Sequence, residues 1–258
     1  MKAREIREHF LQHADWVDRD RTVDTFKHGD PEVEVRSAAV MWMLTNEAIE
    51  RVRELGANLV VAHEPTFFGH FDDAEEVKDD PVYLAKRRRL DEAGLTVLRI
   101  HDSWDVWPEI GVGASLARLL GLRLAQERDR VRRCYAVEPT TLEGFARLVR
   151  AKLGMDAVSM MGDPGRMVRR VGLAFGMIAG IPSMQAFLAM KPDVILAGEL
   201  CHWRDVRYLE DAGAALVLTD HAASENPGMK SLAQFLEKQF RIPAHYVEVG
   251  SPFRTVTA

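Results

Sequence analysis

Short apolar runs alternate with charged, amphipathic segments along most of the chain. Three of these runs, Val35–Leu44, Asn58–Ala62 and Leu95–Ile100, are apolar enough for buried strands, and helical patterns separate them. Gly56 and Gly94 stand where the intervening helices are expected to end. Because strands that alternate with helices are typical of a largely parallel sheet, the pattern predicts an α/β fold.

The same alternation continues to the end of the chain, and its strand–helix rhythm recurs in two halves. The remaining predicted helices are Ala3–Asp15, Pro81–Ala93, Ala114–Leu120, Thr141–Leu153, Pro182–Met190, His202–Asp211 and Met229–Gln239. The remaining predicted strands are Val131–Val137, Asp156–Met160, Arg169–Ala174, Asp193–Ala197, Leu216–Thr219 and His245–Val249. The polar stretch Ala125–Arg133 is the best candidate for a boundary. We therefore expect one lobe of residues 1–125 plus 215–258 and a second lobe of residues 126–214.

Composition and charge exclude several classes of protein. The chain has 258 residues, of which 47% are hydrophobic and 28% are charged, as in an ordinary globular protein. Its net charge of −5 argues against a broad nucleic-acid interface, which needs a basic face. One basic cluster, Lys86 to Arg89, lies in a predicted helix that also carries acidic residues, and we interpret it as a solvated helix face.

Cysteine usage and the N-terminal segment bear on the compartment. Cys134 and Cys201 are the two cysteines, and neither belongs to a CxxC pair, so no disulfide framework or zinc ribbon is expected. That usage suits a reducing cytosol, and we expect a cytoplasmic protein. The first 13 residues mix charges and do not resemble a signal peptide. No apolar run approaches the ~20 residues of a membrane span, so no membrane association is expected.

Histidines and carboxylates follow three of the predicted strands. They are His63 and Glu64, His101 and Asp105, and His221 and Glu225. Any one of these histidines is readily explained by a structural hydrogen bond. Their recurrence at strand ends favours a metal site, because the carboxyl ends of parallel strands meet at one edge of a sheet. Imidazole and carboxylate together suit zinc, manganese or iron.

Four segments, in order along the chain, carry a resemblance to a known family. They are GANLVVAHEP (56–65), HDSWDVWPEIGVGASLARLL (101–120), DVILAGE (193–199) and TDHAASENPGMKSL (219–232). They resemble the signatures of the Nif-three-like family, whose members are also called dinuclear metal-centre hexameric proteins or GTP cyclohydrolase I type 2 homologs. The resemblance extends from near residue 3 to near residue 250.

The resemblance implies a ligand set for two divalent ions of iron, manganese or zinc. His63 matches the first histidine of the family's HHP signature, and Asp105 matches the aspartate that bridges two metals. His221 and Glu225 match the closing HxxxE. Glu64 stands where the family has a second histidine. As a carboxylate it is a harder ligand, so the second metal site either persists with a preference shifted toward iron or manganese or is weak.

Two further residues are candidates for supporting the ligands. His101 is either a ligand itself or a neighbour that orients Asp105, and Glu199 is a plausible supporting base near the site. The segment Asp24–Asp30 departs from the family's "DNvGlqvG" element, which borders the active site, and this departure bears on whether the family's substrate carries over to this chain. No catalytic residue is assigned.

The resemblance also implies an architecture and a function. We expect two similar, intertwined three-layer α/β/α lobes with a metal site in the cleft between them, assembled as a toroidal homohexamer. The expected function is that of a di-metal-dependent hydrolase acting on a small molecule, with a GTP cyclohydrolase-like reaction as one form. The alternative is a non-enzymatic metal-binding or regulatory ring that delivers metal or docks a protein partner.

Overall fold

The structure is a computed structural model that describes residues 1–72 and 75–256. It is a mixed α/β protein, which confirms the predicted fold class. The chain divides into two compact units. Unit 1 comprises Met1–Gly111 and Gly228–Val249, and unit 2 comprises Val112–Pro227 together with the residues from Gly250 onward. The sequence predicted lobe boundaries near residues 125 and 215, whereas the boundaries between the two compact units follow Gly111 and Pro227.

Unit 1 is built on a five-stranded sheet in the order β1-β4-β3-β2-β11. Strands β11, β2, β3 and β4 are parallel, and β1 pairs with β4 antiparallel at one edge. Its elements are α1 (Ala3–His13), β1 (Phe26–His28), β2 (Ala38–Met41), α2 (Asn46–Glu54), β3 (Leu59–Ala62), α3 (Pro81–Ala93), β4 (Thr96–Arg99), α4 (Asp102–Asp105) and β11 (Ala244–Tyr246). The sequence did not predict β1 or α4, because both lie in polar stretches.

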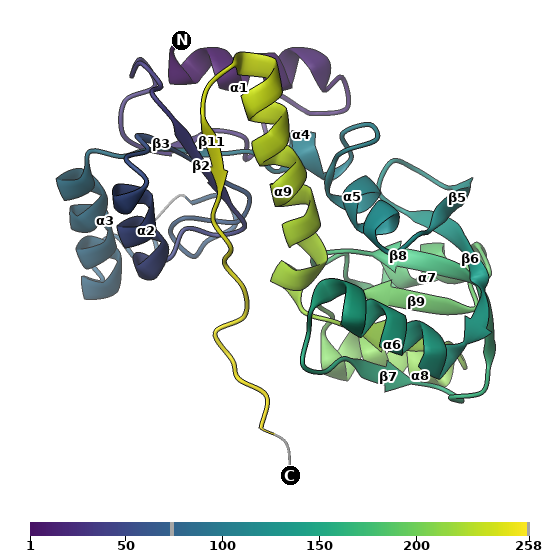
Figure 1. The fold of residues 1–258 in the computed structure, drawn as a ribbon. Helices are drawn as coiled ribbons and strands as arrows, with labels where there is room; N and C mark the ends of the chain where they lie inside the picture. The colour runs from purple at the N-terminus through teal and green to yellow at the C-terminus, as the bar shows by residue number, and fades with distance from the viewer. Residues whose placement is uncertain (73–74, 257–258) are drawn as a thin grey trace. The chain divides into compact units, whose positions relative to one another are not determined.

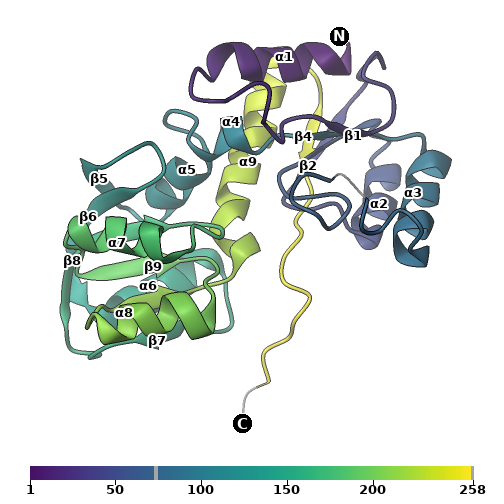
Figure 2. The same ribbon diagram turned by 180° about the vertical axis from the view of Figure 1, so that it is seen from behind.

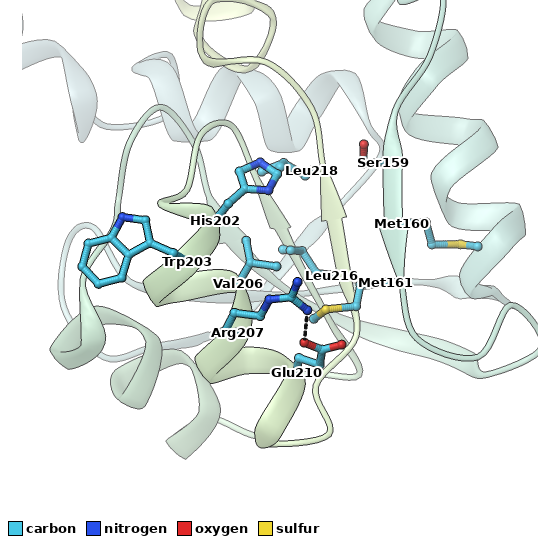
Figure 3. A pocket seen from close by; sticks show the side chains of 10 residues that line it. All are labelled: Ser159, Met160, Met161, His202, Trp203, Val206, Arg207, Glu210, Leu216 and Leu218. Atoms are coloured by element: carbon cyan, nitrogen blue, oxygen red, sulfur yellow. Dashed lines mark hydrogen bonds and ion pairs between the residues drawn. The ribbon is translucent and has the colours of Figure 1, made fainter.

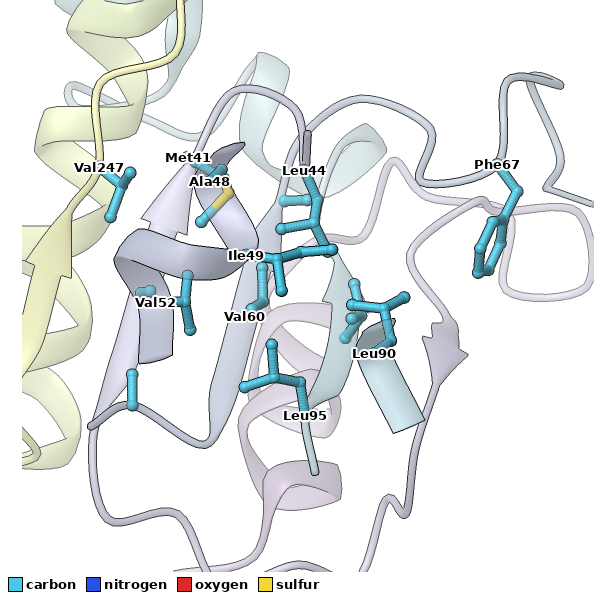
Figure 4. Close-up of a cluster of buried hydrophobic side chains, with 14 of the residues drawn as sticks. Met41, Leu44, Ala48, Ile49, Val52, Val60, Phe67, Leu90, Leu95 and Val247 are labelled. Carbon is cyan, nitrogen blue, oxygen red and sulfur yellow. The ribbon is translucent and has the colours of Figure 1, made fainter. Parts of the chain in front are cut away.

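Helices cover both faces of this sheet. Ile49 and Val52 of α2 and Leu90 of α3 point toward Val60 of β3, in a cluster of fully buried side chains (Figure 4). α1 and the part of α9 (His221–Phe240) from Gly228 onward lie on the opposite side from α2 and α3 (Figures 1 and 2). Burial on both faces explains why β2, β3 and β4 are nearly continuous apolar runs in the sequence.

The ends of α2 and α3 follow their sequence signals. The Thr45 side chain accepts a hydrogen bond from the backbone N–H of Ala48 and caps α2. α3 ends at Gly94 in the left-handed conformation, at φ 60°. The expectation of a fully solvated basic face on α3 is wrong for Lys86. That side chain is buried, and its Nζ donates to the carbonyl of Thr66 at 2.6 Å.

Unit 2 contains a mixed six-stranded sheet in the order β5-β6-β8-β9-β10-β7. Its elements are α5 (Val112–Leu119), β5 (Arg123–Glu127), β6 (Arg133–Thr141), α6 (Leu142–Leu153), β7 (Ser159–Met161), β8 (Met167–Ala174), α7 (Ile181–Ala189), β9 (Val194–Ala197), η1 (His202–Val206), α8 (Arg207–Asp211) and β10 (Leu216–Leu218). α6 covers one face, and α7 and α8 cover the other (Figures 1 and 2). The polar stretch that suggested a boundary overlaps the end of β5, an exposed edge strand.

The helix α9 is longer than the sequence predicted. It begins at His221 rather than at Met229, although Pro227 lies inside it and has no N–H to donate within the helix. The change from unit 2 to unit 1 falls between Pro227 and Gly228. In the part of the chain that the structure describes, no helix has both the length and the apolar composition needed to cross a membrane.

Candidate metal centre

The structure divides the seven residues singled out in the sequence into two sets, one in each compact unit. The unit 1 set contains His63, Glu64, His101 and Asp105, and the unit 2 set contains Glu199, His221 and Glu225. Every member follows a strand of one of the parallel sheet regions, as the sequence pattern predicted.

His63 directly follows the buried strand β3, and its side chain is fully buried. Its Nδ1 lies 3.0 Å from the carbonyl oxygen of Ile100. Because a carbonyl oxygen can only accept, Nδ1 carries the proton and donates it. In a neutral ring the lone pair is then on Nε2, which lies 3.2 Å from Oδ1 of Asp105. The protein thus presents a ligand nitrogen directly to a carboxylate oxygen.

Asp105 is held by the four-residue helix α4, whose first turn is fastened by Asp24. The fully buried carboxylate of Asp24 accepts hydrogen bonds from the backbone N–H groups of His101, Asp102 and Ser103 at 2.7 to 3.0 Å. It also accepts a hydrogen bond from the Ser103 hydroxyl. The sequence analysis did not predict that Asp24 would hold α4 in place. The one sequence feature that pointed to Asp24 was its position at the start of the segment Asp24–Asp30, which differs from the family's early element.

His101 lies between the ligands of unit 1. Its ring stacks on that of His63, with centroids 4.5 Å apart, and its Nε2 lies 3.8 Å from Oε1 of Glu64. Burial works to lower the pKa of His101, but the charge of Asp105 and a hydrogen bond to Asp102 outweigh it, so the pKa is raised. One ligand atom from each of His63, Glu64 and His101 lies within 4.8 Å of the other two. His101 is thus placed to act as a ligand as well as a supporting residue.

The unit 2 set repeats the arrangement found around His63. His221 Nδ1 lies 3.0 Å from Oε2 of Glu199, which accepts its proton, and His221 Nε2 lies 3.3 Å from Oε2 of Glu225. His221 and Glu225 occupy successive turns of α9, so the HxxxE spacing brings both side chains to one face. The Glu225 side chain is 3% exposed. In both units a histidine is oriented through Nδ1 and faces a carboxylate through Nε2.

Two glycines allow the backbone to approach Glu225 and its neighbour Ser224. Gly176 has φ +56°, and a Cβ atom there would lie 2.0 Å from Oε1 of Glu225. A Cβ on Gly198 would lie 2.5 Å from Oγ of Ser224. Ser224 in turn accepts a hydrogen bond from the Gly176 N–H and donates one to the carbonyl of His221. Only glycine at these two positions leaves room for the Glu225 carboxylate and the turn that carries it.

The donor chemistry of both sets fits a divalent metal ion. Two ligands held about 2.1 Å from an ion at a tetrahedral angle lie about 3.4 Å apart. The separations of 3.2 Å in unit 1 and 3.3 Å in unit 2 are close to that value. The hydrogen bonds at Nδ1 correspond to those that usually fix the tautomer of metal-binding histidines. The residues of both sets therefore fit the divalent metal ions that the family resemblance implied.

A two-unit α/β protein with paired histidine and carboxylate side chains after its strands is the class that this fold and site define. The chain belongs to the Duf34/NIF3 (NGG1p interacting factor 3) family, whose model matches residues 6–251. Membership confirms the resemblance on which the predicted ligand set was based.

Several relatives agree with this assignment. The chain is 27% identical over 208 residues to a Pseudomonas aeruginosa protein named GTP cyclohydrolase 1 type 2 homolog, covering 77% of this chain and 78% of that one. A Pyrococcus horikoshii protein of the same name is 24% identical over 222 residues, covering 83% and 85%. A Staphylococcus aureus hypothetical protein superposes with a TM-score of 0.83 at 20% identity, and a Bacillus cereus protein related to NIF3 with 0.84 at 14%; each match covers 99% of both chains. The solved structures support the fold.

Unit 2 also has a pocket outside these two sets. It has a volume of about 480 Å³ and is lined by side chains from β7, η1, α8 and β10 (Figure 3). His202 and the exposed Trp203 come from η1, and Arg207 and Glu210 form an ion pair at 2.6 Å on α8. His202 lines this pocket and has no part in either of the ligand sets.

Proposed function

We propose that this protein binds divalent metal ions through His63, Glu64, Asp105, His221 and Glu225, with two ions of iron, manganese or zinc per chain. The observation that carries the proposal is the arrangement repeated in both units. Each has a histidine whose Nδ1 is engaged and whose Nε2 faces a carboxylate oxygen at 3.2 or 3.3 Å. His101 and Glu199 support the ligands.

We further propose that the protein is a metal-dependent hydrolase of a small molecule. Bound ions supply Lewis acidity and lower the pKa of a coordinated water. The chain itself orients the ligands, through the carbonyl of Ile100 at His63 and the carboxylate of Glu199 at His221. The name GTP cyclohydrolase 1 type 2 homolog, carried by the relatives, supports purine nucleotides as the first substrates to test.

The metal proposal is tested by elemental analysis of protein purified without chelator. Asp105→Ala and His221→Ala should each reduce the metal content strongly. Asp156→Ala and His202→Ala are matched controls, because both residues are exposed and lie outside the two sets. These control variants should retain the wild-type content. Full metal content in both Asp105→Ala and His221→Ala would contradict the assignment.

The enzymatic proposal is tested by a hydrolysis screen of metal-loaded protein with GTP, phosphoesters and amides. Turnover that is abolished by chelator and by Asp105→Ala supports a hydrolase.

The alternative is a metal-binding or regulatory protein that delivers metal or docks a protein partner, and the phrase "interacting factor" in the family's name favours testing it. Stoichiometric metal without turnover of any of these substrates would support that alternative.

Assembly as a homohexamer and a cytoplasmic location complete the proposal. Size-exclusion chromatography with light scattering should give six times the 29.1 kDa mass of one chain. A mass of one or two chains would contradict the hexamer. Cell fractionation tests the location.

A further inference from the structure

Arg99 lies beneath Glu64 with its guanidinium enclosed in unit 1. The side chain is 0% exposed, and it comes from the last residue of β4, next to the strand that leads into His63. Its Nε donates to the carbonyl oxygen of His63 at 2.7 Å, and its Nη1 donates to the carbonyl oxygen of His70. One side chain therefore fastens the backbone on both sides of the turn that carries Glu64.

The third nitrogen of Arg99 faces Glu64 itself. Nη2 lies 3.6 Å from Oε2 of Glu64 and has no hydrogen-bond partner among the described residues. A guanidinium keeps its proton under all ordinary conditions, so this buried positive charge requires a negative charge nearby. The other buried carboxylate near the loop, that of Asp72, already faces Lys27 at 3.8 Å and accepts the N–H groups of Thr66 and Phe67. Glu64 is thus the carboxylate that balances Arg99.

The two oxygens of Glu64 have different neighbours. Oε2 faces Arg99, whereas Oε1 faces Nε2 of His101 at 3.8 Å. The contact with Arg99 therefore turns Oε1 toward the histidines of the unit 1 set. Arg99 also balances the negative charge that Glu64 adds where a histidine would be neutral.

We propose that Arg99 is a positioning residue for Glu64, and that the pair replaces a neutral histidine ligand with a carboxylate and a buried cation. The net charge of the pair is zero, equal to that of an imidazole. Glu64 and Arg99 are then coupled, and either one is unfavourable without the other. This inference rests on the proposed function, since it concerns the affinity of the unit 1 set for metal.

The experiment is a double-mutant cycle with four proteins: wild type, Glu64→His, Arg99→Met and the double variant. Affinity for Mn²⁺ and Zn²⁺ is measured by competition with a chromogenic chelator, and resistance to urea is measured in excess chelator. We expect each single variant to lose at least about tenfold in metal affinity. Glu64→His leaves an unbalanced cation beside the ligands, and Arg99→Met removes the contact that turns Oε1 of Glu64 toward the histidines. The double variant should recover most of both losses. Additive losses in the double variant would overturn the proposal.

Two controls separate the possible explanations. Arg99→Lys keeps the charge but lacks the planar fork that reaches two carbonyl groups and Glu64. Arg99→Lys should fold. If its metal affinity is below the wild-type value, the geometry of the guanidinium as well as its charge is needed to position Glu64. The exposed pair Glu143 and Arg147, at 2.7 Å, gives a matched cycle with Glu143→His and Arg147→Met that should leave metal affinity unchanged.

The cycle also distinguishes failure of this inference from failure of the proposed function. If wild-type protein binds neither ion, the metal proposal fails, and the urea measurements still report whether Glu64 and Arg99 are coupled. If wild-type protein binds metal and the four proteins show additive effects in both measurements, only the role of Arg99 is wrong.

Discussion

Asp24 and Ser103 are 79 residues apart in the chain, and the carboxylate of Asp24 accepts hydrogen bonds from both the backbone N–H and the hydroxyl of Ser103. This contact ties the segment before β1 to the helix that carries Asp105. The geometry of the unit 1 ligands therefore depends on a residue outside them.

Replacing Asp24 should loosen α4. Asp24→Ala leaves three backbone N–H groups and the Ser103 hydroxyl without their acceptor, and we expect a loss of about 3 kcal/mol in the free energy of unfolding together with weaker metal binding. Urea denaturation and metal competition measure the two effects. Asp129→Ala is the control, because Asp129 accepts comparable N–H bonds from Val131 and Arg132 in a partly exposed turn outside the two ligand sets. It should cost about 1 kcal/mol and leave metal binding unchanged. Equal effects of the two variants would contradict the role assigned to Asp24.

Removing the charge of Glu199 should lower the affinity of the unit 2 set for metal without affecting the fold. Glu199→Gln replaces the carboxylate that accepts the Nδ1 proton of His221, and partners of this kind typically change metal affinity by about 10- to 100-fold. Competition with a chelator measures the change. Glu210→Gln serves as the control, since Glu210 is an exposed partner of Arg207 in the pocket of unit 2. Unchanged affinity in Glu199→Gln would show that His221 does not need this partner.

A methyl group at Gly176 should displace Glu225. Gly176→Ala introduces a Cβ atom 2.0 Å from Oε1 of Glu225, so metal affinity should fall about tenfold or more, in addition to the strain at φ +56°. Gly154→Ala is a closely matched control, because Gly154 has φ +66° with nothing within 4 Å of the added atom. It should cost about 1 kcal/mol of stability and no metal affinity. Loss of metal in both variants would point to strain rather than to contact with Glu225.

Lys86 should make stability depend on alkaline pH. Burial lowers the pKa of Lys86 to about 8, against a partly opposing effect from Asp72. Between about pH 8 and the unfolded value near 10.5, the unfolded chain binds the proton and the folded chain does not. The contribution of Lys86 to stability therefore increases as the pH rises through this window. Urea denaturation from pH 7.5 to 10 should show this increase in wild type and lose it in Lys86→Met. Parallel pH profiles would contradict the lowered pKa.

The local elements were largely predictable because their signals are local. β3 and β4 are apolar runs, α2 begins at the cap Thr45, and α3 ends at Gly94, each within a few residues of its predicted place. β1, β5 and α4 were missed because they are polar. β1 and β5 are edge strands, and their backbone pairing with a neighbouring strand is a tertiary contact that leaves no apolar pattern. The extension of α9 back to His221 was missed because Pro227 is ordinarily a helix-ending signal.

The sequence by itself determined the α/β class, the strand ends that carry histidine and carboxylate, and the departure at Glu64. These follow from periodicity and residue type, which are properties of neighbouring positions. The tertiary structure decided which atoms meet: the Nδ1 partners of His63 and His221, the fastening of α4 by Asp24, and the burial of Arg99 against Glu64. The physical reason is that a buried charge or hydrogen-bonding group needs a partner, and the chain can supply that partner from a residue tens of positions away.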